Sequence, residues 1–269
     1  MAASPPSSSA PIPQVDVIIA GAGMAGATLA LALHSGGLSC LLIDPAPFDA
    51  QLAPTFDGRA SAIAYASFRQ WRAVGAGDYL EKVAQPIEQI LVTDAPTPGA
   101  AARPAGSAFL RFESAEIADR SDGEPLGYMV ENRHTRVALS QAVQAAGIPV
   151  LAPASVARMT VEPGQAVITL ADGRTLSAPL VVGAEGRGSV IRREAGIGAI
   201  GWDYRQSGVV ATVAFDAPHH GVAHEYFLPS GPFAILPLTG NRASLVWTES
   251  TPRAEALRTA RDEVFMAFL

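Results

Sequence analysis

Apolar runs separated by glycine and proline define the first elements of this chain. Residues 15–20 form a short apolar run that ends at a glycine cluster, and residues 39–43 form a second one. Both runs have the length of buried strands. Between them, residues 24–35 are largely apolar over a helical length, and Gly36 and Gly37 provide a stop. The order strand, helix, strand predicts a βαβ unit with a right-handed crossover.

The middle of the chain predicts further helices and short strands. We expect helices over residues 59–73 and 132–146, and an apolar strand of the buried, parallel kind over residues 180–184. Short strands bounded by turn residues are expected at 87–93, 108–112, 127–130, 156–161, 166–171 and 175–178. The last three of these follow one another through short turns, which predicts a β-meander.

Beyond Trp202 the chain returns to strand-like patterns. Four such runs predict an antiparallel sheet in a second domain interleaved with the first: 209–215, 222–228, 233–237 and 243–248. Thr251 is expected to cap a final helix that Pro252 opens. The apolar face of this helix would carry Leu257, Val264, Phe265 and Phe268. Because the sequence stops on that apolar face, we expect it to be the N-terminal portion of a longer protein.

Composition and charge exclude several classes of protein. Of the 269 residues, 49% are apolar and 16% are charged, and the net charge is −6. A chain of this kind can bury a core and is not predominantly disordered. No basic stripe with interleaved aromatic residues is present, which disfavours nucleic acid as a partner. Residues 1–13 lack the pattern of a signal peptide, and no apolar run is long enough to span a membrane. We therefore expect a disordered tail over 1–13 and a cytoplasmic protein.

Metal and hydrolase chemistry find little support in the sequence. Cys40 is the single cysteine, which excludes a disulfide framework and a CxxC-type zinc site. His219, His220 and His224 lie close together in sequence, but no carboxylate or cysteine accompanies them at metal-ligand spacing. No metal site is therefore expected. No Gly-x-Ser-x-Gly elbow is present for a serine hydrolase.

The strongest chemical pattern is Gly21-x-Gly23-x-x-Gly26, which follows the first strand and opens the first helix. Gly21 permits a tight turn, Gly23 lets the backbone approach a pyrophosphate, and Gly26 allows the helix to pack closely on the strand. Asp44 ends the second strand, where a carboxylate can accept hydrogen bonds from both ribose hydroxyls and repels a 2′-phosphate. The pattern predicts a dinucleotide site formed by Gly21, Ala22, Gly23, Met24, Ala25, Gly26 and Asp44.

The elements expected after Asp44 help to decide which dinucleotide binds. A nicotinamide-dependent dehydrogenase would continue with further βα units of the same sheet. Here loops, a helix and mixed β structure intervene before the apolar run at 180–184. This interruption favours a flavin, and a plain NAD-dependent dehydrogenase stays open as the alternative.

Four further segments carry a resemblance to a known family. They are residues 57–62 (DGRASA), 127–132 (GYMVEN), 181–192 (VVGAEGRGSVIR), and 227–238 (FLPSGPFAILPL) followed by 244–247 (SLVW). With the glycine motif, they resemble the class A flavoprotein monooxygenases, specifically the ubiquinone-biosynthesis hydroxylases of the UbiH/UbiF/COQ6 group. The resemblance covers nearly the whole ordered chain.

The resemblance implies roles for particular residues. FAD would bind at the glycine loop and Asp44, Arg59 would reach the flavin-side phosphates, and Asn132 would lie near the flavin. Glu185 and Gly186 match the family's Asp-Gly motif, with glutamate in place of aspartate, and would contact the FAD ribose and support binding of reduced pyridine nucleotide. An exposed helical arginine at 59 and a helix cap at 132 remain the structural alternatives.

The resemblance also implies a reaction. NAD(P)H would reduce FAD, O₂ would add to the ring, and the flavin hydroperoxide would hydroxylate a phenol, here a prenylated phenol or another aromatic substrate. No side chain stands out as catalytic. The family's Gly-Asp-Ala-Ala-His motif is absent, which supports the expectation of a longer enzyme. Peripheral association with the inner membrane or with a complex of ubiquinone-biosynthesis proteins stays open.

The expected fold class is α/β, with a Rossmann-like FAD-binding domain interleaved with a mixed or antiparallel-sheet substrate domain. After the tail at 1–13, FAD-binding segments are expected at 14–86 and at 131–200, the second with the β-meander. Substrate-domain segments are expected at 87–130 and 201–250, and 251–269 would start a further helical region. Other functions stay open, namely a small-aromatic hydroxylase, a prenyl reductase, or a non-catalytic flavoprotein subunit of a quinone-synthesis complex.

Overall fold

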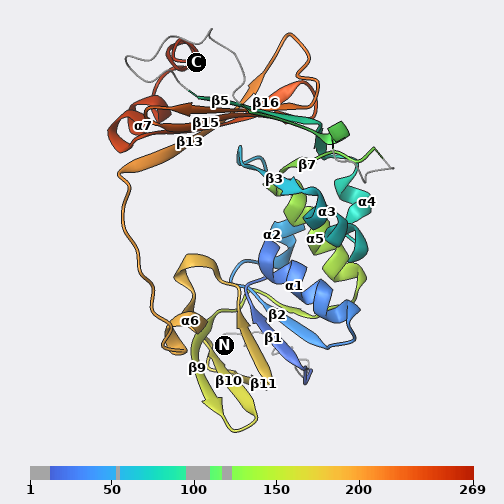
Figure 1. Ribbon diagram of the computed structural model, residues 1–269. Helices are drawn as coiled ribbons and strands as arrows, with labels where there is room; N and C mark the ends of the chain where they lie inside the picture. Colours follow the sequence, from blue (N-terminus) through green and yellow to red (C-terminus); the bar gives the residue numbers. More distant parts are fainter. Residues whose placement is uncertain (1–12, 53–54, 95–109, 117–122) are drawn as a thin grey trace, which may run out of the picture. The chain divides into compact units, whose positions relative to one another are not determined.

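The computed structural model describes residues 13–52, 55–94, 110–116 and 123–269 (Figure 1). The chain forms two compact units, each built from two separate segments. Unit 1 comprises Met1–Ala53 and Leu139–Ala199, and unit 2 comprises Pro54–Ala138 and Ile200–Leu269. Both units combine helices with sheets, which confirms the predicted α/β fold class with interleaved segments.

Unit 1 is organised around a parallel four-stranded sheet in the order β12-β1-β2-β8. Its strands are β1 (Val17–Ala20), β2 (Cys40–Ile43), β8 (Val150–Leu151) and β12 (Leu180–Gly183). Helix α1 (Met24–Ser35) connects β1 to β2, which confirms the predicted βαβ unit. All residues of β1 and β2 are buried, because both strands lie inside the sheet with a layer on each face.

A three-stranded antiparallel meander supplies the second layer of unit 1. It consists of β9 (Val156–Glu162), β10 (Gln165–Leu170) and β11 (Thr175–Ala178), as the turn pattern predicts. Alternate residues of the parallel sheet and of the meander share one apolar core, including Ile18, Leu41, Ile168 and Leu170. The short elements α2 (Phe48–Leu52), η2 (Gly186–Gly188) and α6 (Val190–Glu194) complete this unit, and α5 (Asn132–Ala145) crosses the boundary between the two.

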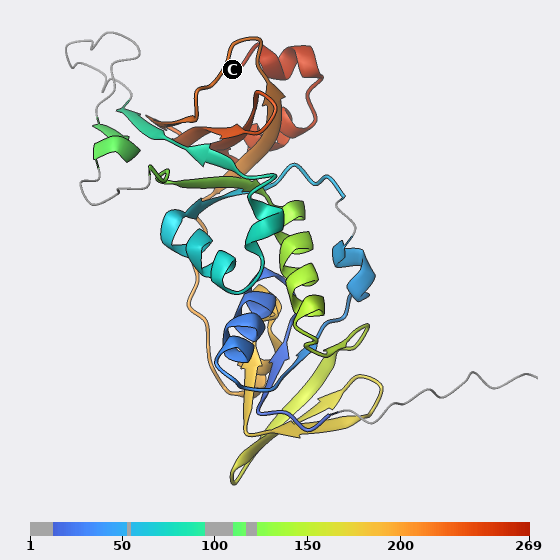
Figure 2. The same ribbon diagram turned by 90° about the vertical axis from the view of Figure 1, so that its right-hand side faces the viewer.

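Unit 2 contains a three-stranded antiparallel sheet in the order β3-β7-β4, with β3 (Ala60–Ala64), β7 (Gly127–Glu131) and β4 (Gln85–Ile87). Helices α3 (Tyr65–Ala73) and α4 (Gly77–Leu80) lie on one side of it (Figure 2). The expectation of a single helix over 59–73 is wrong for its first part. Residues 60–64 form a strand because every one of them pairs with β7, so a distant segment overrides local helical propensity.

The other sheet of unit 2 has six strands in the order β13-β16-β15-β14-β5-β6. They are β5 (Gln89–Asp94), β6 (Leu110–Glu113), β13 (Gln206–Ala214), β14 (Val222–Leu228), β15 (Gly231–Leu238) and β16 (Arg242–Ser250), and η1 (Ser114–Glu116) follows β6. The four C-terminal strands are antiparallel, as predicted. The sheet as a whole is mixed, because β14 pairs in parallel with β5. The expected strand residues 108 and 109 lie outside the described residues.

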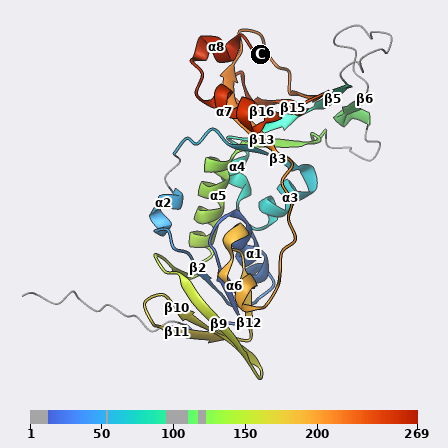
Figure 3. The same cartoon turned by 90° about the vertical axis from the view of Figure 1, so that its left-hand side faces the viewer.

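The C-terminal residues form two short helices, not one. Helix α7 (Thr251–Arg258) and helix α8 (Asp262–Met266) lie together at the β13 end of the sheet (Figure 3). The break follows Thr259, whose hydroxyl donates to the carbonyls of Glu255 and Ala256 at 3.0 and 3.3 Å. A threonine hydroxyl that donates to carbonyls three and four residues earlier competes with the hydrogen bonds of the helix backbone. This competition favours a helix end at Thr259. The helix starts at Thr251, so the residue before it, Ser250, holds the cap position.

Strand β12 is more exposed than the sequence predicts. It is parallel to β1, as expected, but Leu180 is 52% exposed. Within the described residues β12 pairs with β1 alone and therefore forms an edge of the sheet. No helix among the described residues is long and apolar enough to cross a membrane.

Candidate functional site

The glycine loop joins β1 to α1 and has the geometry of a phosphate cradle. Gly21 has φ +102°, and a Cβ there would lie 2.5 Å from the carbonyl oxygen of Ala184. A Cβ on Gly26 would lie 1.9 Å from the Gly21 carbonyl oxygen. Both positions therefore require glycine for the packing of loop, helix and β12. A Cβ on Gly23, in contrast, would meet nothing within 4 Å, so its backbone faces open space.

The start of α1 can bind an anion. Gly23 occupies the cap position, no side chain caps the helix, and no acidic residue lies in its first turn. The backbone N–H groups of Met24, Ala25 and Gly26 thus precede the first N–H that can donate within the helix, that of Ala27 to the Gly23 carbonyl at 2.9 Å. Free N–H groups and the positive end of the helix dipole fit the pyrophosphate of a dinucleotide.

Asp44 closes this loop from the end of β2. One carboxylate oxygen accepts from the Ala22 N–H at 2.8 Å and the other accepts from the Ala46 N–H at 2.9 Å. Each oxygen keeps a further lone pair for a ribose hydroxyl. The structure thereby brings Asp44 and the loop 21–26 together, and this arrangement fits the adenosine part of FAD.

The Glu185 carboxylate is engaged inside unit 1. It accepts from the Ser189 hydroxyl at 2.5 Å and from the backbone N–H groups of Val190 and Ile191 at 3.1 and 3.2 Å. These bonds fix the start of α6. Gly186 has φ +76° and open space where a Cβ would lie. The backbone at Glu185 adjoins the glycine loop, since a Cβ on Gly21 would lie 3.1 Å from the Glu185 nitrogen.

Arg59 and Asn132 lie in unit 2 and are linked to each other. The Asn132 N–H donates to the Arg59 carbonyl at 2.9 Å, and the Asn132 side-chain oxygen accepts from the Ser61 hydroxyl at 2.7 Å. Asn132 is the first residue of α5, and its side chain bonds to β3. The Arg59 side chain is 61% exposed and precedes β3, so it does not lie on a helix.

Asp57 holds Arg59 in place. Its carboxylate pairs with Arg59 at 2.7 Å and with Arg136 at 2.9 Å. Burial by itself raises the pKa of Asp57, but the hydrogen bonds from Arg136 and Arg59 outweigh it and hold this pKa well below its usual range. Asp57 is therefore ionised near neutral pH and holds two arginines beside the start of β3. In the sequence, Asp57 stands out only as the first residue of the segment 57–62.

A buried charge cluster at the end of β7 was not predicted. The Glu131 side chain is 8% exposed and pairs with Arg133 at 2.9 Å and with Arg242 at 3.1 Å. His134 lies 3.4 Å from the same carboxylate, and its other ring nitrogen is 3.0 Å from the Tyr79 hydroxyl. Burial, assisted by Arg133, lowers the pKa of His134. A glutamate at the end of an apolar strand was the available signal in the sequence.

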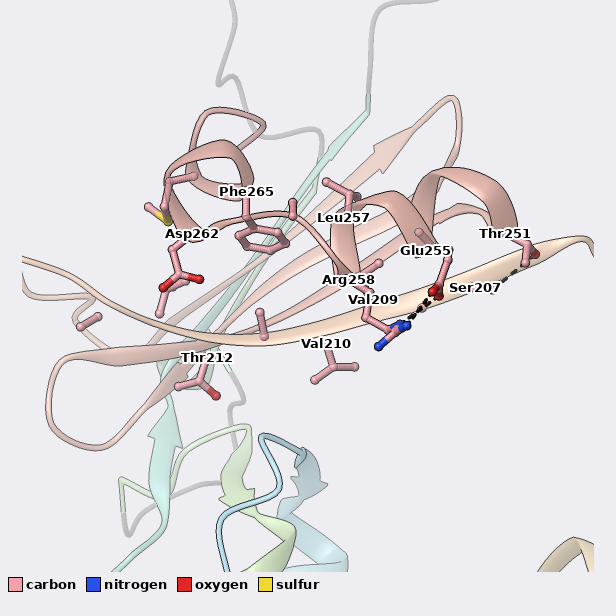
Figure 4. Close-up of a pocket in the computed structure, with 17 residues that line it drawn as sticks. Ser207, Val209, Val210, Thr212, Thr251, Glu255, Leu257, Arg258, Asp262 and Phe265 are labelled. Carbon is pink, nitrogen blue, oxygen red and sulfur yellow. Dashed lines mark hydrogen bonds and ion pairs between the residues drawn. The ribbon is translucent and has the colours of Figure 1, made fainter.

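The described residues form surface grooves outside the glycine loop, and two of these are large. One, of about 780 Å³, follows β12 and α6 in unit 1. The other, of about 810 Å³, lies between β13 and helices α7 and α8 in unit 2 (Figure 4). Phe265 points toward the sheet in this groove, whereas Val210 and Thr212 point away from both helices (Figure 4). The only ion pair drawn there, between Glu255 and Arg258, is an exposed one within α7.

The histidines near residue 220 have local structural partners. His219 lies 2.9 Å from the Leu238 carbonyl through one ring nitrogen and accepts from the Gly221 N–H through the other. Among the described residues no group of three or more His, Cys, Asp and Glu side chains could hold a metal ion.

Curated relatives of this chain are enzymes of ubiquinone biosynthesis by name. It is 41% identical to the ubiquinone hydroxylase UbiL of Rhodospirillum rubrum over 100% of this chain and 61% of that protein. It is 32% identical to the ubiquinone biosynthesis monooxygenase COQ6 of Rattus norvegicus, over 93% of this chain and 53% of the relative. The 3-demethoxyubiquinol 3-hydroxylase of Escherichia coli is 33% identical to this chain, over 90% of this chain and 59% of the relative. The chain thus spans between 53% and 61% of the length of these relatives.

Solved structures have a similar fold, and one family model matches most of the chain. The fold is similar to PqsL of Pseudomonas aeruginosa, with a TM-score of 0.71 at 20% identity over 91% of this chain and 63% of that one. It is also similar to p-nitrophenol 4-monooxygenase PnpA of Pseudomonas putida, with a TM-score of 0.73 at 17% identity. This match covers 91% of this chain and 60% of that one. A family model described as FAD binding domain matches residues 14–266, which include the glycine loop, Asp44 and all of unit 2 from residue 54 to α8. The chain therefore belongs to the FAD binding domain family.

Proposed function

We propose that this chain is the FAD-binding and substrate-sheet portion of a monooxygenase that hydroxylates a prenylated phenol in ubiquinone biosynthesis, with NAD(P)H as reductant. The observation that supports the proposal most is the open backbone at Gly23 beside the Asp44 carboxylate, in a chain 41% identical along its full length to a ubiquinone hydroxylase. The chain is shorter than its relatives, so the activity is proposed for the protein that contains it.

Each predicted site residue has a distinct part in this proposal. The N–H groups at the start of α1 would hold the pyrophosphate, and Asp44 would accept hydrogen bonds from the adenosine ribose. Glu185 and Gly186 would contribute mainly through their backbone, because the Glu185 carboxylate is already bonded to α6. Arg59 would approach the phosphates as a cation fixed by Asp57, and the Asn132 amide NH₂ is available as a donor near it.

The bound cofactor would supply the redox chemistry. In the overall reaction, NAD(P)H and a proton are consumed, one atom of O₂ enters a ring C–H bond, and the other leaves as water. The chain's own residues bind the cofactor, orient it and hold the ring in a site from which water is excluded. Peripheral attachment to a membrane would suit a substrate with an isoprenoid tail and forms part of the proposal.

Purification of the full-length protein tests the proposal directly. We expect a yellow protein with a flavin absorption spectrum, and NADH or NADPH oxidation that a prenylphenol stimulates and that yields a product with one added oxygen. Soluble phenols without a tail, run in parallel, distinguish a small-aromatic hydroxylase. Product without added oxygen would indicate a prenyl reductase. A colourless protein that binds NAD tightly would contradict the proposal.

A further inference from the structure

The register of the six-stranded sheet aligns one residue from every strand. Directly paired residues of neighbouring strands place their side chains on the same face of a sheet. From β6 to β13, the paired residues are Leu110, Val92, Glu225, Ala234, Val246 and Val210. In this set, which we call the Glu225 row, five side chains are apolar and one is a carboxylate.

The Glu225 row lies on the face of the sheet opposite α7 and α8. Trp247, the neighbour of Val246 in β16, packs against Phe265 of α8 with ring centroids 6.3 Å apart. Because side chains alternate along a strand, Val246 points to the other face. Val210 does so visibly (Figure 4). The two ends of the row, Leu110 and Val210, are each 45% exposed.

The described residues of unit 2 cover only part of this face. Ala223, two positions before Glu225 and on the same face, packs into an apolar cluster with Met129 of β7. Phe112, which pairs with Ile90 in the same register, is 46% exposed, and Phe227, two positions after Glu225, is 50% exposed. The described residues of unit 2 thus leave a long apolar surface around a partly buried Glu225.

Within the described residues, the Glu225 carboxylate accepts no hydrogen bond and pairs with no cation. Burial raises its pKa. Arg242, an arginine on the same face, is bonded to Glu131 and to the Thr239 carbonyl. Asp94, which pairs with Phe227, adds a second negative charge on this face. An unpaired carboxylate among apolar side chains destabilises a fold, so its presence points to a function.

We infer that the Glu225 row receives the phenol substrate, with Glu225 accepting a hydrogen bond from the ring hydroxyl while the prenyl tail lies along the apolar residues of the row. This inference rests on the proposed function and extends it to a specificity-determining residue. A prenylated phenol has one strong donor at its head and an otherwise apolar surface. The row presents one acceptor in an otherwise apolar strip, so the two match in chemistry.

Binding measurements on the full-length, FAD-loaded protein test the inference. Two ligands are compared: a prenylphenol with a short tail, and its methyl ether, which cannot donate. Three variants are compared with the unaltered protein. Glu225→Leu removes the acceptor, Glu225→Gln retains a neutral acceptor, and His224→Gln changes the neighbouring half-buried residue that points to the opposite face. Dissociation constants come from calorimetry, and turnover is measured separately.

We expect Glu225→Leu to weaken binding of the phenol by roughly 10- to 100-fold, the range for a hydrogen bond to a charged group. Binding of the ether should change by less than about 3-fold, and Glu225→Gln should fall between the two. His224→Gln should bind both ligands as the unaltered protein does. Because Leu replaces an unpaired charge by an apolar group of similar size, the variant should fold.

The outcomes separate the inference from the proposed function. Equal phenol affinity in the unaltered protein and Glu225→Leu overturns the inference, even if the enzyme hydroxylates prenylphenols. An equal loss for phenol and ether also overturns it, because a general disturbance of the sheet does not depend on the donor. In a third outcome, Glu225→Leu loses affinity for the phenol only, and the unaltered protein does not turn the phenol over. This outcome supports the binding role of Glu225 and refutes the proposed reaction.

Discussion

The Asp44 carboxylate accepts a hydrogen bond from the Ala22 backbone N–H at 2.8 Å. This bond ties the acid at the end of β2 to the glycine loop after β1, so one side chain both shapes the loop and faces the expected ribose site. The two contributions can be separated by substitution.

Asp44→Asn should weaken FAD binding by roughly tenfold or more, because the amide loses the charge and one acceptor that the loop and the ribose share. The loss of one loop bond should lower stability by only about 1 kcal/mol. FAD fluorescence quenching measures the affinity, and urea unfolding measures the stability. Asp49→Asn on α2 is the matched control, since Asp49 is exposed. Unchanged FAD affinity in Asp44→Asn would contradict the assignment.

Gly23 and Gly26 should respond differently to the same substitution. In Gly23→Ala the new Cβ meets no atom of the described residues within 4 Å, so stability should hold while FAD affinity falls by about tenfold from crowding at the pyrophosphate. In Gly26→Ala the Cβ would lie 1.9 Å from the Gly21 carbonyl oxygen, so stability should fall by about 2 kcal/mol or more. Thermal unfolding without FAD, followed by FAD titration, distinguishes the two. Loss of stability in Gly23→Ala would mean that this position is structural.

The Glu131 cluster should make a pH-dependent contribution to stability. Burial raises the pKa of Glu131, but hydrogen bonds from Arg133 and Arg242 outweigh it, so the folded pKa is lower than usual. The contribution is therefore complete above the ordinary value of 4.5 and is lost as pH falls through the folded value. Glu131→Gln should destabilise the protein by about 2–3 kcal/mol at pH 7, because the arginines lose a buried partner.

Urea unfolding at neutral and acid pH checks this prediction. The difference between the unaltered protein and Glu131→Gln should narrow as pH falls below 4.5. Glu255→Gln, which breaks an exposed pair with Arg258, should show no measurable change at any pH. A constant difference across the pH range would show that ionisation of Glu131 is not the cause.

The Tyr128 hydroxyl should lose its proton at a higher pH than an ordinary tyrosine does. Burial, together with its hydrogen bond to Glu124 at 2.8 Å, raises the pKa of Tyr128 to about 12. A raised pKa in the folded state stabilises the fold fully below the ordinary value of 10.0, and this contribution is lost as pH rises through about 12. Tyr128→Phe should cost about 1 kcal/mol near neutral pH, since Glu124 loses a donor.

The phenolate absorbance follows this titration. The step near pH 12 should be missing in Tyr128→Phe and present in Tyr204→Phe, which alters a tyrosine that is 72% exposed. If the late step persists in Tyr128→Phe, another tyrosine is responsible for it.

The local pattern was sufficient for the βαβ unit and its cofactor loop. Gly21, Gly23, Gly26 and Asp44 are close in sequence and belong to consecutive elements, so their spacing already fixes how they meet. The meander and the four C-terminal strands were also predictable, because short turns join strands that alternate in polarity. These features depend on interactions over short stretches of chain.

The remaining features of the fold depend on the pairing of strands that are far apart in sequence. Residues 60–64 became a strand only through β7, and β14 found a parallel partner in β5, far away in sequence. The same pairing brought Glu131 to Arg242 and placed Glu225 in a row of apolar side chains. By itself the sequence determined most of the elements and the dinucleotide loop, since hydrophobic period and turn residues act locally. Only the tertiary structure decided which charges are buried, paired or left alone, because burial and register depend on contacts between distant segments.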